Sequence, residues 1–517
     1  MSRIFTVTTA IDYTNSAPHI GHAYEKVLAD VIARYHRLKG EEVFFLTGVD
    51  QHGQKVQQSA AKEGQAPAEF VKGVTQKFID LWQKLDVKYD KWAETIDPQH
   101  KRVVQGMLQR LFEEGEIYKD KQAGHYSIRQ EQFLTDKERD ANGEFGPEWG
   151  QVEFREEENY YFKLSKHKEW LLGYIDRRTD AILPDFRQTE LRNAVERLNG
   201  DLCISRPKSR LDWGIELPFD KDFVTYVWFD ALTNYISFAG YDPSLSTFNS
   251  QPSTFRDKWP ALQIIGKDIL VPAHGIYWLI MLHAVGFPDE QIPQLLVHGW
   301  WNLGGAKMSK SAGNVVDPNV LAEKYGAEAL RYYLMSDIAT GNDADFSEER
   351  LVARYNSDLA NSLGNLVNRT LNMAHRYRDG VVKHRGGDSP LAEQSRDLVQ
   401  RYDRAMSSFQ IQAAIASVTD FATTCNTYIE MTAPWKLAKD AERADTLDHT
   451  LFALAEALRT IAILVSPILP VGAKGILYQL NLSPDYSIAD AAWGGLPQEH
   501  RLGKPVPLFP RIEASGD

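Results

Sequence analysis

The sequence predicts a doubly wound α/β domain with a parallel, Rossmann-like sheet, interrupted by a small α+β insertion and followed by an all-α bundle. Two observations predict the sheet. Short apolar runs alternate with helical patterns over residues 1–117, and the alternation returns over residues 224–344. A third observation predicts the bundle, because apolar stripes at helical spacing run through residues 345–485.

The first half of the sheet domain starts at the N-terminus. Residues 5–10 form a β-branched and aromatic run typical of a strand, and a polar loop with Pro18 follows. A helical pattern runs from about residue 22 to 38 and ends before Gly40. The next strand is expected at 42–47, followed by the polar loop 48–53. Ligands in such sheets bind at the carboxyl ends of strands, where both loops lie.

Residues 118–223 break this rhythm with short strands, many charges and a glycine-rich middle, and we expect a connective insertion there. Strands return at 224–229, 262–265 and 294–298. Long helices are predicted at 347–376, 390–433 and 441–464, with one linker at 379–389. The last segment, 486–517, is irregular and is expected to pack back on the body.

Composition restricts the class of protein. A chain of 517 residues is long enough for two to four domains. The longest apolar run, 458–469, is interrupted by Arg459 and Pro467 and is too short to span a bilayer, so we expect no membrane segment. The N-terminus resembles no signal peptide, and Cys203 and Cys425 form no metal or disulfide pattern, which favours the cytoplasm. The net charge of −12 argues against a general nucleic-acid binder.

The first chemical motif is Pro18-His19-Ile20-Gly21-His22, between the first strand and its helix. A helix N-terminus presents unpaired N–H groups to an anion such as phosphate, and two imidazoles add further donors. Gly21 leaves room for a flat base against the backbone. Taken alone, the motif is more often a pair of capping histidines in a loop.

The second motif, Gly305-Ala306-Lys307-Met308-Ser309-Lys310-Ser311, lies almost three hundred residues later. Lysine supplies a compact positive charge that suits a loop closing over a polyphosphate. Any one such loop is more often simply a solvated basic segment. The two motifs together are far more specific than either one.

Together these motifs resemble those of the class I aminoacyl-tRNA synthetases. The resemblance implies that ATP and an amino acid form an aminoacyl-adenylate and pyrophosphate, and that the amino acid then passes to the 3′ end of a tRNA. It implies that His19 and His22 contact the ATP phosphates and that Lys310, with Lys307 nearby, stabilises the transition state. It also implies that Gly21, Gly266 and Asp268 bind the nucleotide, Asp268 through the ribose hydroxyls.

Further stretches resemble the methionyl members of that family, among them Gly48-Val49-Asp50-Gln51-His52-Gly53 and Tyr226-Val227-Trp228-Phe229-Asp230-Ala231. The resemblance implies that Asp50 holds the amino group of methionine. A thioether gains from aromatic contacts, and a tyrosine hydroxyl or imidazole N–H can donate to its sulfur. The side-chain pocket implied is Ile11, Tyr13, Trp228, Ala231, Leu232, Tyr235, Ile269 and His274. Off these motifs, such aromatic residues are more often core.

Two departures from the family pattern concern the sheet domain and the insertion. His274 lies one residue further from Lys267 than the family spacing gives, and we expect a bulge at Pro272 to absorb the extra residue. Many relatives carry zinc-binding cysteines in the insertion. Here the four matching positions are Ser127, Gln130, Gly146 and Trp149, none of them a zinc ligand. We therefore expect no structural zinc, and a knuckle packed around Trp149, Tyr126 and Phe145.

The helical region resembles the anticodon-binding domain of the methionyl enzymes. Asn365 and Arg369 are four residues apart and share a helix face with Asn361. Trp435 matches an aromatic residue on which an anticodon base stacks. Without the other motifs, we would interpret the asparagine as a residue that pairs helices and the tryptophan as a core residue.

The resemblance as a whole implies a methionine–tRNA ligase that uses ATP with Mg²⁺, L-methionine and tRNA(Met), and we expect a monomer. Three alternatives remain open at this point. One is an adenylyl-transferring enzyme that uses no tRNA, and another is a non-catalytic tRNA-binding relative. The third is a neighbouring synthetase for valine, isoleucine, leucine or cysteine, although the insertion is small for an editing domain.

Overall fold

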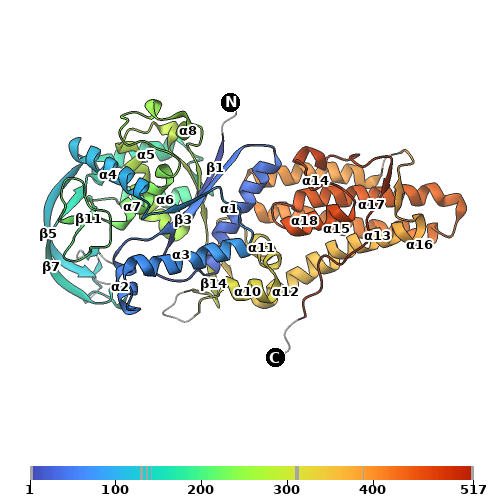
Figure 1. The fold of residues 1–517 in the computed structure, drawn as a ribbon, viewed down its shortest axis with the longest axis horizontal. Helices are drawn as coiled ribbons and strands as arrows, with labels where there is room; N and C mark the ends of the chain where they lie inside the picture. Colours follow the sequence, from blue (N-terminus) through green and yellow to red (C-terminus); the bar gives the residue numbers. More distant parts are fainter. Residues whose placement is uncertain are drawn as a thin grey trace.

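The computed structural model describes residues 4–127, 132–134, 138–140, 142–308, 314–387 and 389–513. The molecule is elongated: an α/β lobe forms one end and a helical lobe the other. The two meet around helices α1 (Ile20–Leu38), α11 (Ala327–Ser336) and α12 (Glu348–Arg354) (Figure 1). In the part of the chain that is described, no helix is long and apolar enough to cross a membrane.

The α/β lobe is built on a seven-stranded sheet in which every pairing is parallel. Its order is β2-β3-β1-β12-β13-β8, and β4 also pairs with β3. The strands are β1 (Phe5–Thr9), β2 (Asp12–Tyr13), β3 (Val43–Asp50), β4 (Lys91–Glu94), β8 (Ile182–Leu183), β12 (Leu262–Gly266) and β13 (Gln294–His298).

β1 occupies the centre of the sheet, and the chain leaves it in two directions. It first runs outward to β3 and returns much later to the other side of β1 as β12. Val7 therefore pairs with Phe45 on one side and with Leu262 on the other. A crevice opens where the strand order reverses, beyond the carboxyl ends of β1 and β12, and this is where parallel sheets bind ligands.

Helices cover both faces of this sheet. α1 (Ile20–Leu38) follows β1 and is buried along most of its length, including the charged residues Lys26 and Asp30. α1 starts two residues before the predicted helix because the His19 side chain caps it. The other helices of the lobe are α2 (Gln54–Lys62), α3 (Pro67–Lys84), α4 (Pro98–Glu113), α5 (Lys168–Arg177), α6 (Asp185–Glu196), α7 (Val227–Ser237), α8 (Ser253–Arg256) and α9 (Leu279–Ala284).

The insertion contains an antiparallel sheet of its own, at the far end of the α/β lobe (Figure 1). Its order is β6-β5-β7-β9, and the long strands β5 and β7 pair over their full length. The strands are β5 (Ile117–Ser127), β6 (Gln132–Leu134), β7 (Val152–Phe162) and β9 (Leu202–Cys203).

The predicted insertion 118–223 is not wholly separate from the central sheet. β8 pairs parallel with β13 and forms an edge of that sheet, so the stretch returns to the catalytic core in its middle. A strand of two residues carries no periodicity that a sequence could reveal.

The apolar run 224–229 was also expected to be a strand of the central sheet, and that prediction is wrong. β11 (Phe223–Thr225) pairs antiparallel with β10 (Ser205–Pro207), and α7 starts at Val227. A short apolar run that is buried in either conformation does not distinguish a strand from a helix.

A small sheet and two helices lead from the α/β lobe toward the bundle. β14 (Trp301–Leu303) forms a hairpin with β15 (Ala306–Lys307) and pairs parallel with β16 (Ala344–Asp345). Between them lie α10 (Pro318–Tyr325) and α11 (Ala327–Ser336).

The bundle starts with α12 (Glu348–Arg354), the π-helical segment Tyr355–Gly364 and α13 (Asn365–Arg378). The predicted helix 390–433 is two helices, α14 and α15, because the chain turns at Phe409, whose φ is 57°. The remaining elements are β17 (Val381–Lys383), α14 (Pro390–Ser407), α15 (Ile411–Thr432), α16 (Pro434–Leu437), α17 (Ala444–Val465), α18 (Pro470–Gln479) and β18 (Glu499–Arg501).

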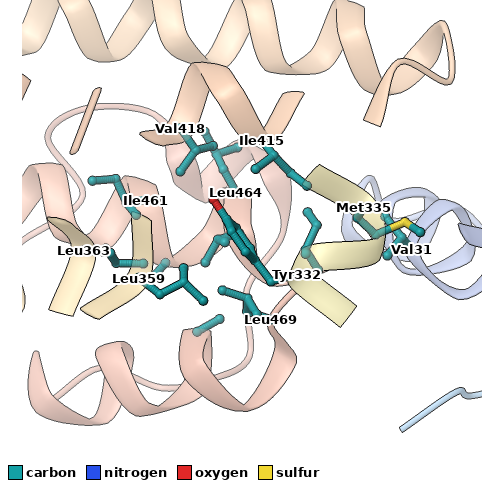
Figure 2. Packing of buried hydrophobic residues seen from close by; sticks show 14 of the residues in the cluster. Val31, Tyr332, Met335, Leu359, Leu363, Ile415, Val418, Ile461, Leu464 and Leu469 are labelled. Atoms are coloured by element: carbon teal, nitrogen blue, oxygen red, sulfur yellow. The ribbon is translucent and has the colours of Figure 1, made fainter. Parts of the chain in front are cut away.

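One hydrophobic core runs through the junction of the two lobes. Tyr332 of α11 points between Leu359, Ile415 and Leu464 of the bundle, while Met335 on the same helix lies against Val31 of α1 (Figure 2). In the C-terminal segment, β18 (Glu499–Arg501) pairs with β17 of the bundle.

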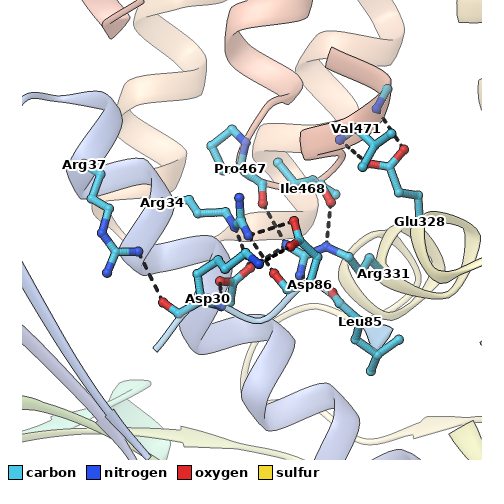
Figure 3. Close-up of polar contacts among 12 residues, drawn as sticks. Asp30, Arg34, Arg37, Leu85, Asp86, Glu328, Arg331, Pro467, Ile468 and Val471 are labelled. Atoms are coloured by element: carbon cyan, nitrogen blue, oxygen red, sulfur yellow. Dashed lines mark hydrogen bonds and ion pairs between the residues drawn. The ribbon is translucent and has the colours of Figure 1, made fainter. Parts of the chain in front are cut away.

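A buried arginine joins the lobes through polar contacts. Arg331 of α11 is 0% exposed and donates to Asp30 of α1 and to the backbone carbonyls of Leu85, Pro467 and Ile468 (Figure 3). The contact between Arg331 and Asp30 is 2.7 Å. This single side chain therefore fixes α1, the end of α3 and the turn between α17 and α18 relative to one another.

Candidate active site

The two histidines of the first motif are held at the N-terminus of α1. The His19 side chain accepts a hydrogen bond from the Gly21 N–H at 3.1 Å, and the His19 N–H donates to Nδ1 of His22 at 3.1 Å. Their rings lie 3.7 Å apart between centroids. A Cβ at residue 21 would lie 2.9 Å from the His19 ring, so this reciprocal cap requires glycine there. The motif thus acts as a cap and still presents its rings to the crevice.

A cavity of about 330 Å³ opens above this helix end. It lies beyond β1, β12 and β13, at the predicted crevice. All described residues that were predicted for catalysis or nucleotide binding line it: His19, Gly21, His22, Gly266, Asp268 and Lys307. The fold therefore brings the two motifs to one site across almost three hundred residues. Lys310 lies outside the described residues.

Lys307 reaches the cavity from the β14–β15 hairpin. Its Nζ lies 3.5 Å from Oδ2 of Asp268 and 3.8 Å from the centre of the Trp300 ring. Lys267 approaches the same ring at 3.9 Å and pairs with Asp343 at 2.5 Å. Trp300 therefore holds two ammonium groups near this cavity by cation–π contacts. No motif in the sequence marked this tryptophan.

The cavity floor contains a buried charge cluster that the sequence analysis did not single out. Lys26 donates to Asp12 at 2.6 Å, to Glu25 at 2.8 Å and to the carbonyl of Ala10 at 2.8 Å. Asp12, Glu25 and His298 line the cavity. The available signal was a lysine on the apolar face of the first helix, which is uncommon unless the charge is paired.

A second cavity, of about 420 Å³, adjoins the first and shares Ala10, Ile11, Tyr13 and Ile269 with it. All nine residues predicted for the methionine pocket line it: Ile11, Tyr13, Asp50, Trp228, Ala231, Leu232, Tyr235, Ile269 and His274. Mostly apolar and aromatic walls with one carboxylate suit an apolar side chain that carries an ammonium group.

The hydrogen bonds within this pocket fix the state of His274. Burial lowers its pKa to about 4, so the ring is neutral near pH 7. Its Nδ1 lies 3.1 Å from the carbonyl of Ile269, which can only accept, so the ring proton is on Nδ1. The Tyr235 hydroxyl then donates to Nε2 at 2.7 Å. The two groups that could donate to a thioether sulfur thus donate to other acceptors in this structure.

The backbone is irregular at Val271, directly before Pro272, where we expected a bulge. Val271 has extended backbone angles, φ −115° and ψ 122°, inside the otherwise π-helical segment Leu270–Trp278. Pro272 and His274 both line the pocket. That this irregularity absorbs an extra residue relative to the family stays a prediction.

Asp50 is a buried carboxyl group that lacks a cationic partner among the contacts recorded for it. Burial, reinforced by the charge of Asp230, raises its pKa well above the ordinary value. Its hydrogen bond is a long one, 3.4 Å from the His52 N–H. An ammonium group in the pocket would supply the missing positive charge.

Asp230, behind the pocket, was not predicted as a site residue. It pairs with His52 at 2.7 Å and with His100 at 2.8 Å. Burial would raise its pKa, but the charges and hydrogen bonds of the two histidines lower it to about 2. Asp230 lies on α7 with Trp228 and Ala231, so these contacts fix the helix that forms one pocket wall.

The insertion was expected to form a metal-free knuckle. The Ser127 hydroxyl donates to the carbonyl of Trp149 at 2.5 Å, while Gln130 lies outside the described residues. Arginines cover the expected aromatic residues: Arg155 and Arg210 the ring of Tyr126, and Arg139 that of Phe145. Across the described ranges no group of three or more His, Cys, Asp or Glu side chains could hold a metal ion. The absence of zinc stays a prediction.

The predicted anticodon residues lie on the helical lobe, and none of them lines either cavity. Asn361 and Asn365 are exposed and line a cleft of about 490 Å³ together with Pro507, Leu508 and Phe509 of the C-terminal segment. Arg369 pairs with Glu430 at 2.6 Å. Trp435, at the start of α16, is half-buried against the core.

Comparison with known proteins gives two family models that match. The model described as "tRNA synthetases class I (M)" matches residues 5–144 and 149–371, and that described as "Anticodon-binding domain of tRNA ligase" matches 391–505.

Curated relatives match along almost the whole chain. The methionine–tRNA ligase of Lactococcus lactis is 38% identical over 99% of this chain and 78% of its own length. That of Caldanaerobacter subterraneus is 40% identical over 99% of this chain and 80% of its own.

A solved structure of Mycobacterium tuberculosis methionyl-tRNA synthetase in complex with methionyl-adenylate superposes with a TM-score of 0.91 at 35% identity. It covers 98% of this chain and 100% of the other. The apo form of the same enzyme gives 0.85 at 32% identity, covering 99% of each chain.

Proposed function

Because this chain belongs to the methionyl branch of the class I tRNA synthetases, we propose that its two adjoining cavities hold ATP and methionine for one reaction. The chain activates methionine with ATP to give methionyl-adenylate and pyrophosphate, and then transfers the methionyl group to the 3′ end of tRNA(Met). The roles of the individual residues are inferred from where they lie.

The first cavity suits the nucleotide. The N-terminus of α1 offers N–H groups and a positive dipole end to phosphates, and His19 and His22 add imidazole donors. Gly266 and Asp268 follow β12 on the opposite side, where the Asp268 carboxylate would accept hydrogen bonds from the ribose hydroxyls. Lys307 now pairs with Asp268 and would turn toward the phosphates when a ribose replaces it.

The second cavity suits methionine. Asp50 would pair with the ammonium group, while Trp228, Tyr235 and His274 would surround the thioether. With its donors engaged inside the wall, the pocket would recognise the sulfur by packing and polarizability. The carboxylate of methionine would then lie at the residues shared by both cavities, next to the α-phosphate.

The reaction then needs only positioning and charge stabilisation. A methionine carboxylate oxygen attacks the α-phosphorus, the new P–O bond forms, and the bond to the bridging oxygen of pyrophosphate breaks. Negative charge grows on the departing pyrophosphate, which His19, His22, Lys307 and, on the family resemblance, Lys310 would stabilise. Mg²⁺ would enter with the phosphates. The described residues form no carboxylate cage for it, and we assign it no step.

The observation that carries this proposal is that His19, His22 and Lys307 line one cavity beside the pocket of Asp50 and His274. The test is pyrophosphate exchange into ATP, measured with each standard amino acid. Methionine alone should support exchange. His19→Asn, His22→Asn and Lys307→Met should each lower kcat at least about tenfold, as expected for a lost charge-stabilising group.

The matched control is Lys324→Met, which removes an exposed lysine that pairs with Glu348 away from both cavities. It should leave the exchange rate unchanged. Exchange with another amino acid, or full activity of the His22→Asn variant, would contradict the proposed residue roles.

We further propose that Asn361, Asn365, Arg369 and Trp435 read the anticodon. Trp435 lies in the region that matches an anticodon-binding domain, whereas the other three residues lie in the region that matches the class I synthetase model. The match to an anticodon-binding domain disfavours an adenylyl-transferring enzyme without tRNA. A monomer in the cytoplasm remains our expectation. Its oligomeric state can be measured by sedimentation.

A further inference from the structure

The floor of the nucleotide cavity carries charges that the reaction above does not use. Lys26 is 0% exposed and Asp12 4%, so water screens their contact weakly. On its other side, Lys26 pairs with Glu25, whose second oxygen lies 3.1 Å from Nε2 of His298. The cluster extends from β2 through α1 to the end of β13.

Asp12 is the member of this cluster that faces the first motif. Its Oδ1 lies 4.0 Å from Nε2 of His22. Because Nδ1 of His22 accepts the His19 N–H, the proton of the neutral ring is on Nε2. The other carboxyl oxygen of Asp12, Oδ2, is buried and makes no hydrogen bond. A buried oxygen without a donor disfavours the ionised carboxyl group.

The carboxylate of Asp12 opposes the proposed ligand. Glu25 has two partners, Lys26 and His298, whereas Asp12 shares Lys26 with Glu25 and lies directly beneath a cavity for a polyanion. Protonation of Asp12 would remove the negative charge that lies nearest to the first motif. Burial raises the pKa of Asp12 to about 7 although Lys26 opposes this, so the proton is readily taken up.

We propose that Asp12 takes up a proton when ATP binds, so that its carboxyl group becomes neutral and Nε2–H of His22 is left to the phosphates. The proton comes from solvent and returns there after pyrophosphate leaves. The inference rests on the proposed nucleotide site at His19 and His22. Within the described residues, the other titratable groups that line this cavity or contact Asp12 are Tyr13, His19, His22, Glu25, Lys26, Asp268, His298 and Lys307.

The proposal predicts a definite pH dependence. A carboxyl group with a pKa of about 7 is mostly protonated at about pH 6 and mostly ionised at about pH 8. Bound phosphates raise this pKa further, because they disfavour a second anion nearby. Proton uptake should therefore be small at the lower pH and approach one proton per ATP at the higher. The affinity for ATP should fall above pH 7 by up to about tenfold per pH unit.

Isothermal titration calorimetry of the full chain with magnesium–ATP, without methionine, tests this directly. The heat measured in two buffers of different ionisation enthalpy gives the number of protons taken up. Asp12→Asn should still bind ATP but should lose the uptake at about pH 8. Lys26→Met should lose it too, because without the ammonium group the pKa of Asp12 rises until it is protonated before ATP arrives.

Glu328→Gln is the matched control. Glu328 is another carboxyl group whose pKa burial raises, but it lies on α11 at the lobe junction, where it accepts the Val471 and Gly472 N–H groups. The Glu328→Gln variant should take up as many protons per bound ATP as the unchanged chain does. This number includes any proton that ATP itself binds. Circular dichroism checks that each variant is folded.

If both Asp12→Asn and Lys26→Met took up as many protons per ATP as the unchanged chain, the inference would be overturned. The proton would then belong to another group of the cavity. If His19→Asn and His22→Asn left the affinity for ATP unchanged, the proposed nucleotide site itself would be overturned. The two failures are therefore distinguishable in the same experiment.

Discussion

At the scale of single residues, the pocket depends on buried polar groups that satisfy one another. Tyr235 lies on α7, and His274 lies on the π-helical segment after β12. One hydrogen bond between them fixes the orientation of both side chains. A neutral, oriented imidazole presents an apolar and polarizable surface to a thioether. The wall of the pocket is thereby fixed before methionine binds, which reduces the ordering cost of binding.

Tyr235→Phe should therefore weaken methionine recognition. It leaves Nε2 of His274 as a buried acceptor without a donor, which costs about 1–3 kcal/mol. We expect kcat/KM for methionine to fall about tenfold or more in pyrophosphate exchange, with KM for ATP unchanged. Tyr332→Phe removes a hydroxyl that donates to Asp358 at the lobe junction and is the control. Equal losses in the two variants would show that general destabilisation is responsible.

Asp230 should make the stability depend on pH. Its pKa is lowered to about 2 in the folded chain, so its pairs with His52 and His100 stabilise the fold above the ordinary value of 3.8. That stability, on the order of 2 kcal/mol, is lost as the pH falls from about 4 to 2. Asp230→Asn should be less stable in urea near pH 7, and the difference should narrow in acid. A constant difference from pH 7 to pH 3 would contradict this assignment.

At the scale of elements, α1 connects the chemistry to the rest of the fold. Its first turn caps itself with His19 and His22, its second carries the charge cluster of Glu25 and Lys26, and its middle holds Asp30 against the bundle. One helix therefore carries the proposed phosphate site, Lys26 as the partner of the proposed proton acceptor Asp12, and a contact of the lobe junction. A rigid helix transmits a displacement at one of these places to the others.

α13 and α15 form the face proposed to read tRNA, and an ion pair already occupies it. Arg369 pairs with Glu430, which is 60% exposed, so the pair adds little to stability but competes with RNA for the guanidinium group. Glu430→Gln should raise the affinity for tRNA(Met) about twofold or more at low salt. Arg369→Gln should lower the slope of log affinity against log salt by about 0.7 to 0.9.

Filter binding over a range of salt concentrations measures both effects. Arg401→Gln is the control, because Arg401 also forms an exposed ion pair, with Asp397 on the same helix, α14. An unchanged salt slope in Arg369→Gln would remove this arginine from the RNA-binding face.

At the scale of the whole molecule, the two lobes share one core and one buried arginine. Arg331 donates to a carboxylate and three carbonyls from segments that are far apart in the chain, and all of these contacts are inaccessible to water (Figure 3). A packed core thus connects the lobe that carries the proposed anticodon residues with the lobe that carries the proposed nucleotide cavity.

Arg331→Met should lower the free energy of unfolding by about 3–5 kcal/mol, because it breaks a buried ion pair and leaves carbonyls without donors. Urea unfolding measures this. Arg34→Met is the control: Arg34 also pairs with Asp30, but its side chain is 19% exposed, and its loss should cost clearly less. Similar decreases in the free energy of unfolding for both variants would show that burial of Arg331 does not determine its contribution to stability.

The sequence by itself determined the parts that local patterns encode. Strands predicted at 5–10, 262–265 and 294–298 appear in the structure, where apolar runs rich in β-branched residues lie between turn residues. The motif residues and pocket residues followed from resemblance, and those described lie where two cavities meet. The division of the helical region was less accurate, because the turn at Phe409 breaks a continuous apolar stripe.

Only the tertiary structure decided the rest. A two-residue strand such as β8 exists because β13 offers it a partner. The pairing of Lys26 with Asp12, and of Asp230 with His52 and His100, depends on which segments pack together and exclude water. Burial is a property of the assembled fold, and burial sets both the strength of these charges and their pKa values. Local sequence therefore encodes the elements, while the environment that makes them chemically active arises only from long-range packing.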